Sequence, residues 1–328
     1  MTRVLFPLAL AYQAGSRVNN ILFDCGLRKI RRVSLPVISV GNTAFGGSEK
    51  TPLVMHLLSH LLESGFKPAL VTRGYRGRWE KSGGILSGGI PTSATWQDTG
   101  DEPYMISRNL PQVGIYVGRK RIDSCRKAEQ AGFDTIILDD GFQHRQLYRD
   151  LDIVLFRSGE RMARESFSSL NRADIVLLKK NDDFRTRHRI SSRFPKAKVY
   201  FYSVVNSGFL SFPDNSPVSP ELLKTRKILA LCGIARPQRF FSLLEKEGLK
   251  PAVSLSFPDH HSYPVSSKNK ILQAAKKTET DALLTTEKDV FKLEEIQKAA
   301  QVPVYYNKID LRVEENLYRD LLSVHKDG

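Results

Sequence analysis

Residues 37–52 read Val-Ile-Ser-Val-Gly-Asn-Thr-Ala-Phe-Gly-Gly-Ser-Glu-Lys-Thr-Pro, and the rest of the chain can be interpreted from this stretch. The apolar run Val37–Val40 predicts a buried strand, and the apolar positions of residues 53–62 recur at the spacing of an amphipathic helix. A glycine-rich turn between a strand and a helix presents backbone N–H groups to phosphate oxygens. We therefore expect a phosphate-binding turn, in which Lys50 adds charge and Thr51 is able to bind magnesium.

This turn departs from the common phosphate-loop pattern G-x-x-x-x-G-K-[ST], because Ala44 and Glu49 stand where the pattern has glycine. A glutamate next to Lys50 adds a side chain and a negative charge close to the phosphates, which weakens ATP binding unless that side chain turns outward. The alternative interpretation is a glycine turn with an incidental Lys-Thr pair. The position between a buried strand and an amphipathic helix favours phosphate binding.

Short apolar runs alternate with helical stretches after this turn, as is typical of parallel sheets buried on both faces. The runs are Ala69–Val71, Gly114–Val117, Thr135–Leu138, Ile153–Phe156 and Ile175–Leu178. Residues 206–220 then gather Gly, Ser, Pro and Asn, which is typical of a linker. We predict an α/β fold: a P-loop NTPase-like parallel sheet flanked by helices in residues 1–205, a linker in residues 206–225, and a smaller α/β domain in residues 226–328.

The composition excludes disorder and a membrane span, since 41% of the 328 residues are hydrophobic but no apolar run approaches the roughly 20 residues that a bilayer requires. Fifty Lys and Arg against 35 Asp and Glu give a net charge of +15, which attracts phosphates, nucleic acid or an anionic membrane surface. The three cysteines lack metal-ligand spacing, and they favour a reducing compartment. We expect a cytoplasmic protein.

Residues 1–32 combine apolar positions at helical spacing with the basic cluster Arg28–Arg32. This pattern predicts one or two amphipathic helices. Such helices pack against a protein core or lie in a membrane interface, and both interpretations stay open.

Two further motifs place acidic residues next to the expected sheet. Asp139 and Asp140 follow the run at residues 135–138, where a carboxylate at the carboxyl end of a strand can bind Mg²⁺. Asp101, in the motif Gly100-Asp-Glu-Pro, stands at the start of an expected helix, as a helix cap or as a general base for phosphoryl transfer. An Asp-Asp-Gly sequence is also common in turns that only connect two elements and have no functional role.

The paired histidines of Phe257-Pro-Asp-His-His-Ser-Tyr263 follow another expected strand. Adjacent residues of an extended chain point to opposite sides, so the two are not expected to bind one metal together. A pair of one histidine and a carboxylate is sterically easier to form than a metal site that uses both histidines. A carboxylate held by a neighbouring histidine keeps its charge and orientation while it accepts a hydroxyl proton.

These motifs occur in an order that resembles the tetraacyldisaccharide 4'-kinase family over nearly the whole chain. The matching segments are PVISVGN, RGY, GDEP, LDDGFQHR, RDLDIVL, RADIVLL, GIARPQRF, FPDHHSY and TTEKD. The resemblance implies transfer of the ATP γ-phosphate to the 4'-hydroxyl of a tetraacylated glucosamine disaccharide 1-phosphate in lipid A biosynthesis. It also implies that the enzyme is peripheral on the cytosolic face of the inner membrane.

The resemblance also implies roles for individual residues. Those implied in binding ATP are Ala44, Phe45, Gly46, Gly47, Ser48, Glu49, Lys50, Thr51, Arg73, Arg121, Gln143 and His144. Those implied in catalysis are Asp101 as general base with His260 as its partner, Lys50 and Asp140. Those implied in binding Mg²⁺ are Thr51, Asp139 and Glu165, although the segment before Glu165 is shorter than in the family.

The expected cofactors are ATP and Mg²⁺, and the expected partners are the lipid A disaccharide precursor and the anionic inner-membrane surface. We expect a monomer that does not bind nucleic acid. Two alternatives remain open: a P-loop kinase or NTPase with a soluble acceptor, and a non-catalytic basic protein that binds membranes or nucleic acid. Deleting residues 1–32 would leave the turnover of a soluble-acceptor enzyme unchanged. A non-catalytic binder would bind DNA in a salt-sensitive way without binding ATP.

Overall fold

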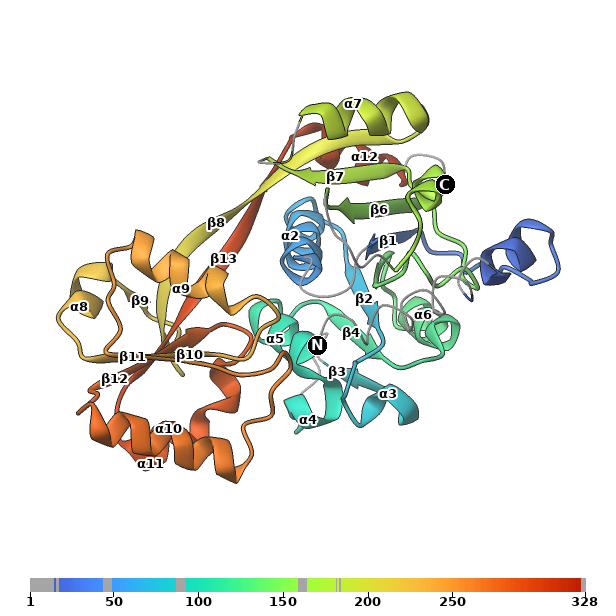
Figure 1. The fold of residues 1–328 in the computed structure, drawn as a ribbon. Helices are drawn as coiled ribbons and strands as arrows, with labels where there is room; N and C mark the ends of the chain where they lie inside the picture. The colour runs from blue at the N-terminus through green and yellow to red at the C-terminus, as the bar shows by residue number, and fades with distance from the viewer. Residues whose placement is uncertain are drawn as a thin grey trace. The chain divides into compact units, whose positions relative to one another are not determined.

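The computed structural model describes residues 15, 18–43, 49–86, 93–158, 164–180, 182 and 184–325. The chain divides into two compact units: unit 1 is Met1–Ser203 with Leu311–Gly328, and unit 2 is Val204–Asp310. Figure 1 labels the elements of each.

Unit 1 contains a largely parallel sheet in the order β8-β7-β6-β1-β5-β2-β4-β3. Its strands are β1 (Val37–Asn42), β2 (Pro68–Thr72), β3 (Gly84–Leu86), β4 (Gly114–Val117), β5 (Thr135–Asp139), β6 (Leu151–Phe156), β7 (Ile175–Lys179) and the first part of β8 (Lys198–Phe212). β3 pairs antiparallel with β4, whereas β1 pairs parallel with both β5 and β6. All six residues of β1 are buried, as the continuous apolar run predicts for an inner parallel strand.

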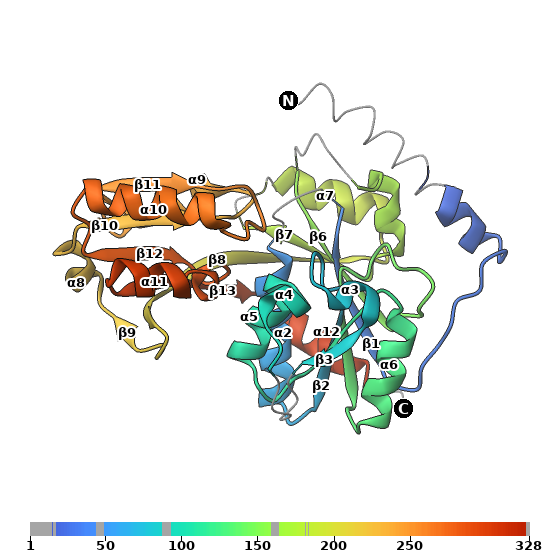
Figure 2. The same ribbon diagram turned by 90° about the horizontal axis from the view of Figure 1, so that it is seen from below.

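Helices cover both faces of this sheet. The helices of unit 1 are α2 (Lys50–Glu63), α3 (Trp79–Ser82), α4 (Trp96–Thr99), α5 (Asp101–Asn109), α6 (Arg121–Gln130), α7 (Phe184–Arg193), α12 (Asn316–Ser323) and the 3-10 helix η1 (Phe167–Arg172); residues 18–24 are also helical. Leu53, Leu57 and Leu61 recur every four residues on the buried stripe of α2. Figures 1 and 2 show α2 and α6 on opposite sides of the central strands.

The strand order continues in unit 2 as β11-β10-β12-β13-β8, within the same hydrogen-bonded sheet, and β9 pairs antiparallel with β8. Its elements are β9 (Pro217–Val218), α8 (Pro220–Lys224), β10 (Ile228–Cys232), α9 (Pro237–Lys246), β11 (Val253–Ser256), α10 (Val265–Lys277), β12 (Ala282–Thr286), η2 (Val290–Lys292), α11 (Glu294–Ala300) and β13 (Val304–Val313). β10, β11, β12 and β13 are mutually parallel.

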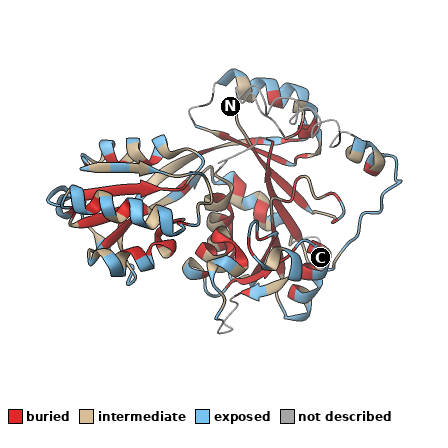
Figure 3. Cartoon of the chain, turned by 60° about the horizontal axis from the view of Figure 1, so that its bottom comes forward, coloured by how far each residue is buried: buried red, intermediate tan, exposed pale blue. Residues whose placement is uncertain are grey.

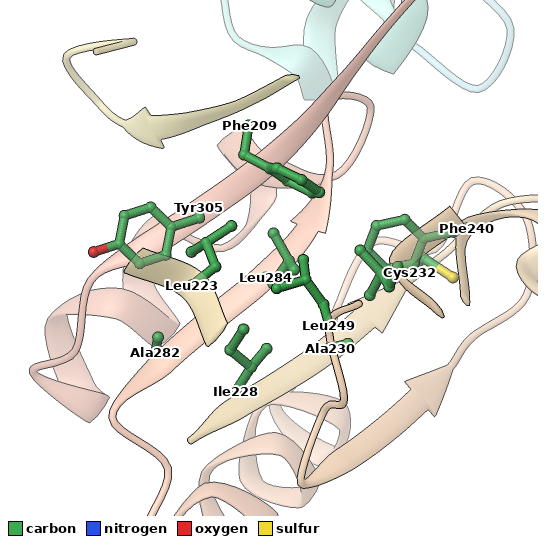
Figure 4. Close-up of a cluster of buried hydrophobic side chains, with 11 residues drawn as sticks. Phe209, Leu223, Ile228, Ala230, Cys232, Phe240, Leu249, Ala282, Leu284 and Tyr305 are labelled. Carbon is green, nitrogen blue, oxygen red and sulfur yellow. The ribbon is translucent and has the colours of Figure 1, made fainter. Parts of the chain in front are cut away.

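Alternate side chains of β10 enter two different cores of unit 2. Ile228, Ala230 and Cys232 pack with Phe240 and other residues in the cluster that Figure 4 shows. Leu229 and Leu231 point to the other face, where they pack with residues of α10 and α11. A strand whose successive residues are all apolar can satisfy both faces only between two layers of helices. Figure 3 shows the strands of both units as largely buried.

The predicted linker at residues 206–225 is not a linker in the structure. This segment contains the end of β8, then β9 and α8. Its polar residues make ordered contacts: the Asn206 side chain accepts hydrogen bonds from Asn307 Nδ2 at 2.6 Å and from the Gly208 amide at 3.0 Å. The Gly, Ser and Asn content thus reflects a partly polar strand, which a search for apolar runs does not detect.

The C-terminal residues also belong to a different unit from the one that the sequence predicted, which placed all of residues 226–328 in the smaller domain. Leu311–Gly328 belongs to unit 1, although it follows unit 2 in the sequence. Tyr318 of α12 stacks on His60 of α2 with ring centroids 4.0 Å apart, and its hydroxyl lies 2.7 Å from His56 Nε2. Asp320 accepts hydrogen bonds from Lys198 Nζ and the Tyr200 hydroxyl.

Among the residues that the structure describes, no helix is both long enough and apolar enough to cross a bilayer.

Because α12 belongs to unit 1, a core substitution in α12 is predicted to destabilise unit 1 and not unit 2. Leu321 is fully buried, and Leu321→Ala is expected to lower the free energy of unfolding of unit 1 by about 2–5 kcal/mol. Amide hydrogen exchange should therefore speed up in α2 and β5 and stay slow in β10 and β12. Leu284→Ala, in the core of unit 2, is the reciprocal control and should show the opposite pattern. Faster exchange of β10 and β12 in Leu321→Ala would mean that the chain end belongs to unit 2.

Candidate active site

The expected phosphate turn connects β1 to α2. β1 ends at Asn42 and α2 begins at Lys50, whereas the predicted ATP-binding residues Ala44, Phe45, Gly46, Gly47 and Ser48 lie outside the described residues. Lys50 Nζ forms an ion pair with Asp140 and lies 3.3 Å from Asn42 Oδ1. Thr51 follows in the first turn of α2, at the carboxyl edge of the sheet, where the helix N-terminus favours anions.

The Asp-Asp-Gly turn packs directly against the end of β1. Asp139 is the last residue of β5, and its register partner in β1 is Val40. A Cβ on Gly41 would lie 2.4 Å from the Cβ of Phe142, so glycine is required for this close approach. The two predicted motifs therefore meet at one edge of the sheet.

The two aspartates of this turn have different surroundings. Asp139 Oδ2 accepts a hydrogen bond from Thr72 Oγ1 at 2.9 Å. Asp140 has a left-handed backbone with φ 51°, and its carboxylate accepts hydrogen bonds from Lys50 and from Arg164 Nη1, the latter at 2.8 and 2.9 Å. Asp140 is thus held by two cations, whereas the Asp139 carboxylate accepts from the neutral hydroxyl of Thr72.

These surroundings move the two pKa values in opposite directions. Burial raises the pKa of Asp139 to about 6, against the attraction of Lys50, and the charges of Glu102 and Asp140 raise it further. Burial would also raise the pKa of Asp140, but Lys50 and Arg164 together lower it far below its usual range. Asp140 is therefore charged at neutral pH, whereas the pKa of Asp139, about 6, lies close to neutral pH.

Asp101 lies in unit 1 as the first residue of α5 and is 6% exposed. The cap of this helix is Gly100, with φ 88°, so Asp101 does not occupy the capping position that is the common role for aspartate. A Cβ on Gly77 would lie 2.5 Å from the Gly100 amide nitrogen, so the turn after Arg73 packs tightly on this motif. The charge of the neighbouring Glu102 contributes to the raised pKa of Asp139.

The two expected arginines differ in their contacts. Arg121 is 8% exposed, and its Nη2 lies 3.4 Å from the Asp139 carbonyl oxygen. Burial lowers the pKa of Arg121, and the charges of Asp140 and Asp139 raise it. Arg73 donates through Nε to Glu80 at 2.8 Å, with its side chain 47% exposed. The structure thus brings Arg121 to the Asp-Asp turn and pairs Arg73 with Glu80.

Gln143 and His144 also lie at this edge. Gln143 Nε2 donates to the Asn42 carbonyl oxygen at 2.9 Å, which ties the turn after β5 to the end of β1. Burial lowers the pKa of His144 to about 4, and the charges of Arg121 and Arg149 lower it further. Its imidazole is therefore neutral at physiological pH.

Glu165 is 3% exposed, and its carboxylate pairs with Arg172 and lies 3.4 Å from Asn20 Nδ2. Its backbone is close to the phosphate turn, because the amides of Arg164 and Glu165 approach the Thr43 carbonyl oxygen at 2.6 and 3.3 Å. The segment is thus attached to the start of that turn.

His260 belongs to unit 2 and lies in the loop after β11, with a left-handed backbone at φ 57°. Its Nε2 is 3.7 Å from Asp259 Oδ2 and 3.4 Å from Lys288 Nζ, and Lys288 also donates to Asp259 Oδ1 at 3.2 Å. His261 instead lies 2.8 Å from Ser267 Oγ and stacks on Phe257. The adjacent histidines therefore have separate partners.

Three residues at this edge were not among the predicted site residues. Arg164 pairs with Asp140, Asn42 contacts Lys50, and Thr72 donates to Asp139. Asn42 and Thr72 end β1 and β2, so their places at strand ends were the available signal. Nothing in the sequence near Arg164 points to an aspartate 24 residues earlier.

The described residues can therefore hold an anion with Lys50 and the first turn of α2, and a hard cation with carboxylate and hydroxyl oxygens. This is the combination that phosphoryl transfer from a nucleotide needs.

The family model described as "Tetraacyldisaccharide-1-P 4'-kinase" matches residues 1–326. A tetraacyldisaccharide 4'-kinase of Desulfotalea psychrophila is 33% identical over 320 residues, covering 92% of this chain and 90% of the relative. A tetraacyldisaccharide 4'-kinase of Syntrophus aciditrophicus is 32% identical over 350 residues, covering 99% of this chain and 93% of the relative.

A solved structure shares the fold over nearly the whole length. The crystal structure of LpxK from Aquifex aeolicus in complex with ATP matches with a TM-score of 0.78 and 28% identity, covering 99% of each chain. With the site described above, these matches show that the chain belongs to the tetraacyldisaccharide-1-P 4'-kinase family and is an ATP-dependent kinase.

Proposed function

We propose that this protein transfers the γ-phosphate of ATP to the 4'-hydroxyl of a tetraacylated glucosamine disaccharide 1-phosphate, as the names of its relatives indicate. The observation that carries the proposal is the ion pair between Lys50 and Asp140, which places the phosphate-turn lysine against the Asp-Asp-Gly turn. In the reaction the acceptor oxygen bonds to the γ-phosphorus, the bond to ADP breaks, and the hydroxyl proton passes to a base.

In this proposal Lys50 and the first turn of α2 bind the ATP phosphates, with Arg121 as a further cation. Gln143 and the neutral His144 line the site, and Arg73 contributes if it exchanges Glu80 for an anionic ligand. Lys50 already lies at a carboxylate, so its ammonium group is oriented before ATP enters.

The donor set fits magnesium. Asp139 and Thr51 supply hard oxygen ligands of the kind that Mg²⁺ prefers, and Glu165 is attached by its backbone to Thr43 at the start of the same turn. The raised pKa of Asp139 indicates a buried carboxylate whose charge a divalent cation would stabilise. A bound Mg²⁺ would neutralise charge on the phosphates during transfer.

We assign the general base to Asp101. It is almost fully buried at the start of α5, and the charge of the adjacent Glu102 acts on Asp139. His260 is proposed to act with it from unit 2, where the contacts with Asp259 and Lys288 orient its ring.

Lys50→Ala and Asp101→Ala are expected to reduce transfer of label from ATP to the lipid disaccharide by about 10²- to 10⁴-fold each, the range for loss of a phosphate cation or a general base. Removing Mg²⁺ with EDTA should also abolish transfer in the unsubstituted protein. Thermal unfolding should show that both variants remain folded.

Matched controls are Lys67→Ala and Asp123→Ala. Lys67 is an exposed lysine between α2 and β2, and Asp123 is an exposed aspartate in the first turn of α6. Both should retain full transfer. Normal transfer by Asp101→Ala would remove Asp101 from the base role, and a failure of the unsubstituted protein to label the disaccharide would overturn the proposed substrate.

We also propose that the N-terminal segment docks the enzyme on the anionic cytosolic face of the inner membrane, where the lipid substrate resides. Its described part exposes large apolar side chains: Val18 and Ile21 at 58% each, Leu27 at 75% and Ile30 at 46%. Basic residues with exposed side chains accompany them, namely Arg28, Lys29, Arg31 and Arg32. Exposed apolar groups beside cations favour an interface of anionic headgroups and acyl chains. The enzyme is proposed to act there as a monomer.

Leu27→Asp is expected to weaken binding to vesicles that contain phosphatidylglycerol by about tenfold or more, because it removes a leucine from the acyl boundary and adds repulsion. Co-sedimentation with such vesicles, compared with purely zwitterionic ones, measures the effect. Leu222→Asp is the control, since Leu222 is 43% exposed but lies in unit 2. Equal binding by both variants would exclude the segment as the membrane contact.

A further inference from the structure

Glu49 occupies an unusual position for a charged residue. It directly precedes the phosphate-turn lysine, where the common pattern has glycine, and its backbone is left-handed with φ 63°. Glycine adopts this conformation without steric cost, whereas other residues keep it only when their surroundings hold them there. Contacts of the Glu49 side chain should therefore be strong enough to hold this backbone.

Within the part of the chain that the structure describes, Arg157, Lys179 and Tyr202 donate to the carboxylate of Glu49. Lys179 Nζ lies 2.7 Å from Oε1, while the Tyr202 hydroxyl lies 2.7 Å and Arg157 Nη2 3.3 Å from Oε2. The Glu49 side chain is only 9% exposed, so these contacts are shielded from water. The side chain is thus directed into the protein, and its negative charge is offset by two cations.

The three donors come from one row of the sheet. Phe156 of β6 is in register with Leu178 of β7, which places Arg157 beside Lys179 at the carboxyl edge. Lys179 is in turn in register with Tyr202 of β8. Three successive strands therefore present a guanidinium, an ammonium and a hydroxyl to the same carboxylate. Such a row forms only when all three strands keep their register.

Glu49 also controls the start of α2. It is the cap residue of that helix, and its carbonyl oxygen accepts from the Leu53 amide at 3.3 Å. Lys50 and Thr51 follow immediately. Anchoring the Glu49 side chain to β6, β7 and β8 therefore restricts where the first turn of α2 can lie.

We propose that Glu49 is a positioning residue for the ATP phosphates: its carboxylate, bound by Arg157, Lys179 and Tyr202, replaces glycine in fixing the entry into α2. The inference rests on the proposed function, in that the turn before Lys50 binds ATP. It explains how the turn accepts a glutamate without placing an unpaired negative charge beside the phosphates.

The chemistry of Tyr202 agrees with a permanent donor role. Tyr202 is 3% exposed, and burial together with the charge of Glu49 raises the pKa of its hydroxyl well above the usual range. The hydroxyl therefore stays protonated at any physiological pH and always donates to the carboxylate.

The test is steady-state kinetics of Glu49→Gln, which preserves the shape of the side chain and removes its charge. KM for ATP is expected to rise about tenfold, the effect of losing a charge-assisted hydrogen bond, with kcat and KM for the lipid within about twofold. Tyr202→Phe should raise KM for ATP in the same direction, by less. Glu63→Gln, at the exposed far end of α2, is the matched control and should leave all three values unchanged.

Glu49→Gly distinguishes a glutamate that positions the turn from one that the turn merely accommodates. It relieves the backbone but leaves the three donors without their carboxylate, so KM for ATP should rise here as well. A lower KM in Glu49→Gly, or an unchanged KM in Glu49→Gln, would overturn the inference. The effects of Glu49→Gln and Lys179→Met should be less than additive when the two are combined, because the substitutions remove the same contact.

Lys50→Ala separates this inference from the function on which it rests. Loss of activity in Lys50→Ala together with an unchanged KM in Glu49→Gln would reject the role of Glu49 alone. Full activity in Lys50→Ala would instead reject the phosphate site itself.

Discussion

The ion pair between Lys50 and Asp140 joins two segments that are 90 residues apart in the sequence. Lys50 opens α2 and Asp140 follows β5, so the pair can form only if both turns leave the same edge of the sheet. The parallel pairing of β1 with β5 supplies that edge, and the close approach of Gly41 to Phe142 leaves no room for a shifted register. The Lys50 side chain is 16% exposed, so its charge without the carboxylate of Asp140 would be costly. The other site residues of unit 1 are arranged around this constraint.

The surroundings of each carboxylate at the site, and not its residue type, determine its pKa. Asp140 is held by Lys50 and Arg164 and remains ionised, whereas burial raises the pKa of the adjacent Asp139 to about 6. Two neighbouring aspartates can thus serve different purposes, one as a fixed partner of the lysine and one as a ligand that a cation completes. Glu49 follows the same logic, because its charge is tolerated next to the phosphate turn only where Arg157 and Lys179 offset it.

The division of the chain matters for the chemistry. Unit 1 carries the phosphate turn, the two aspartates and Asp101, while His260 belongs to unit 2. The chain passes from unit 1 to unit 2 within β8 and returns within β13, since both strands contain a unit boundary.

The sequence alone was sufficient for what depends on local spacing. Continuous apolar runs predicted the inner strands, a four-residue apolar repeat predicted α2, and the order of the short motifs predicted the family. Tertiary structure decided what depends on strand order and register. It assigned residues 311–328 to unit 1, made residues 206–212 a strand instead of a linker, and joined Glu49 to the ends of β6 and β7 and to Tyr202 within β8. These contacts link residues more than one hundred positions apart, and no local period records which side chains a sheet will bring together.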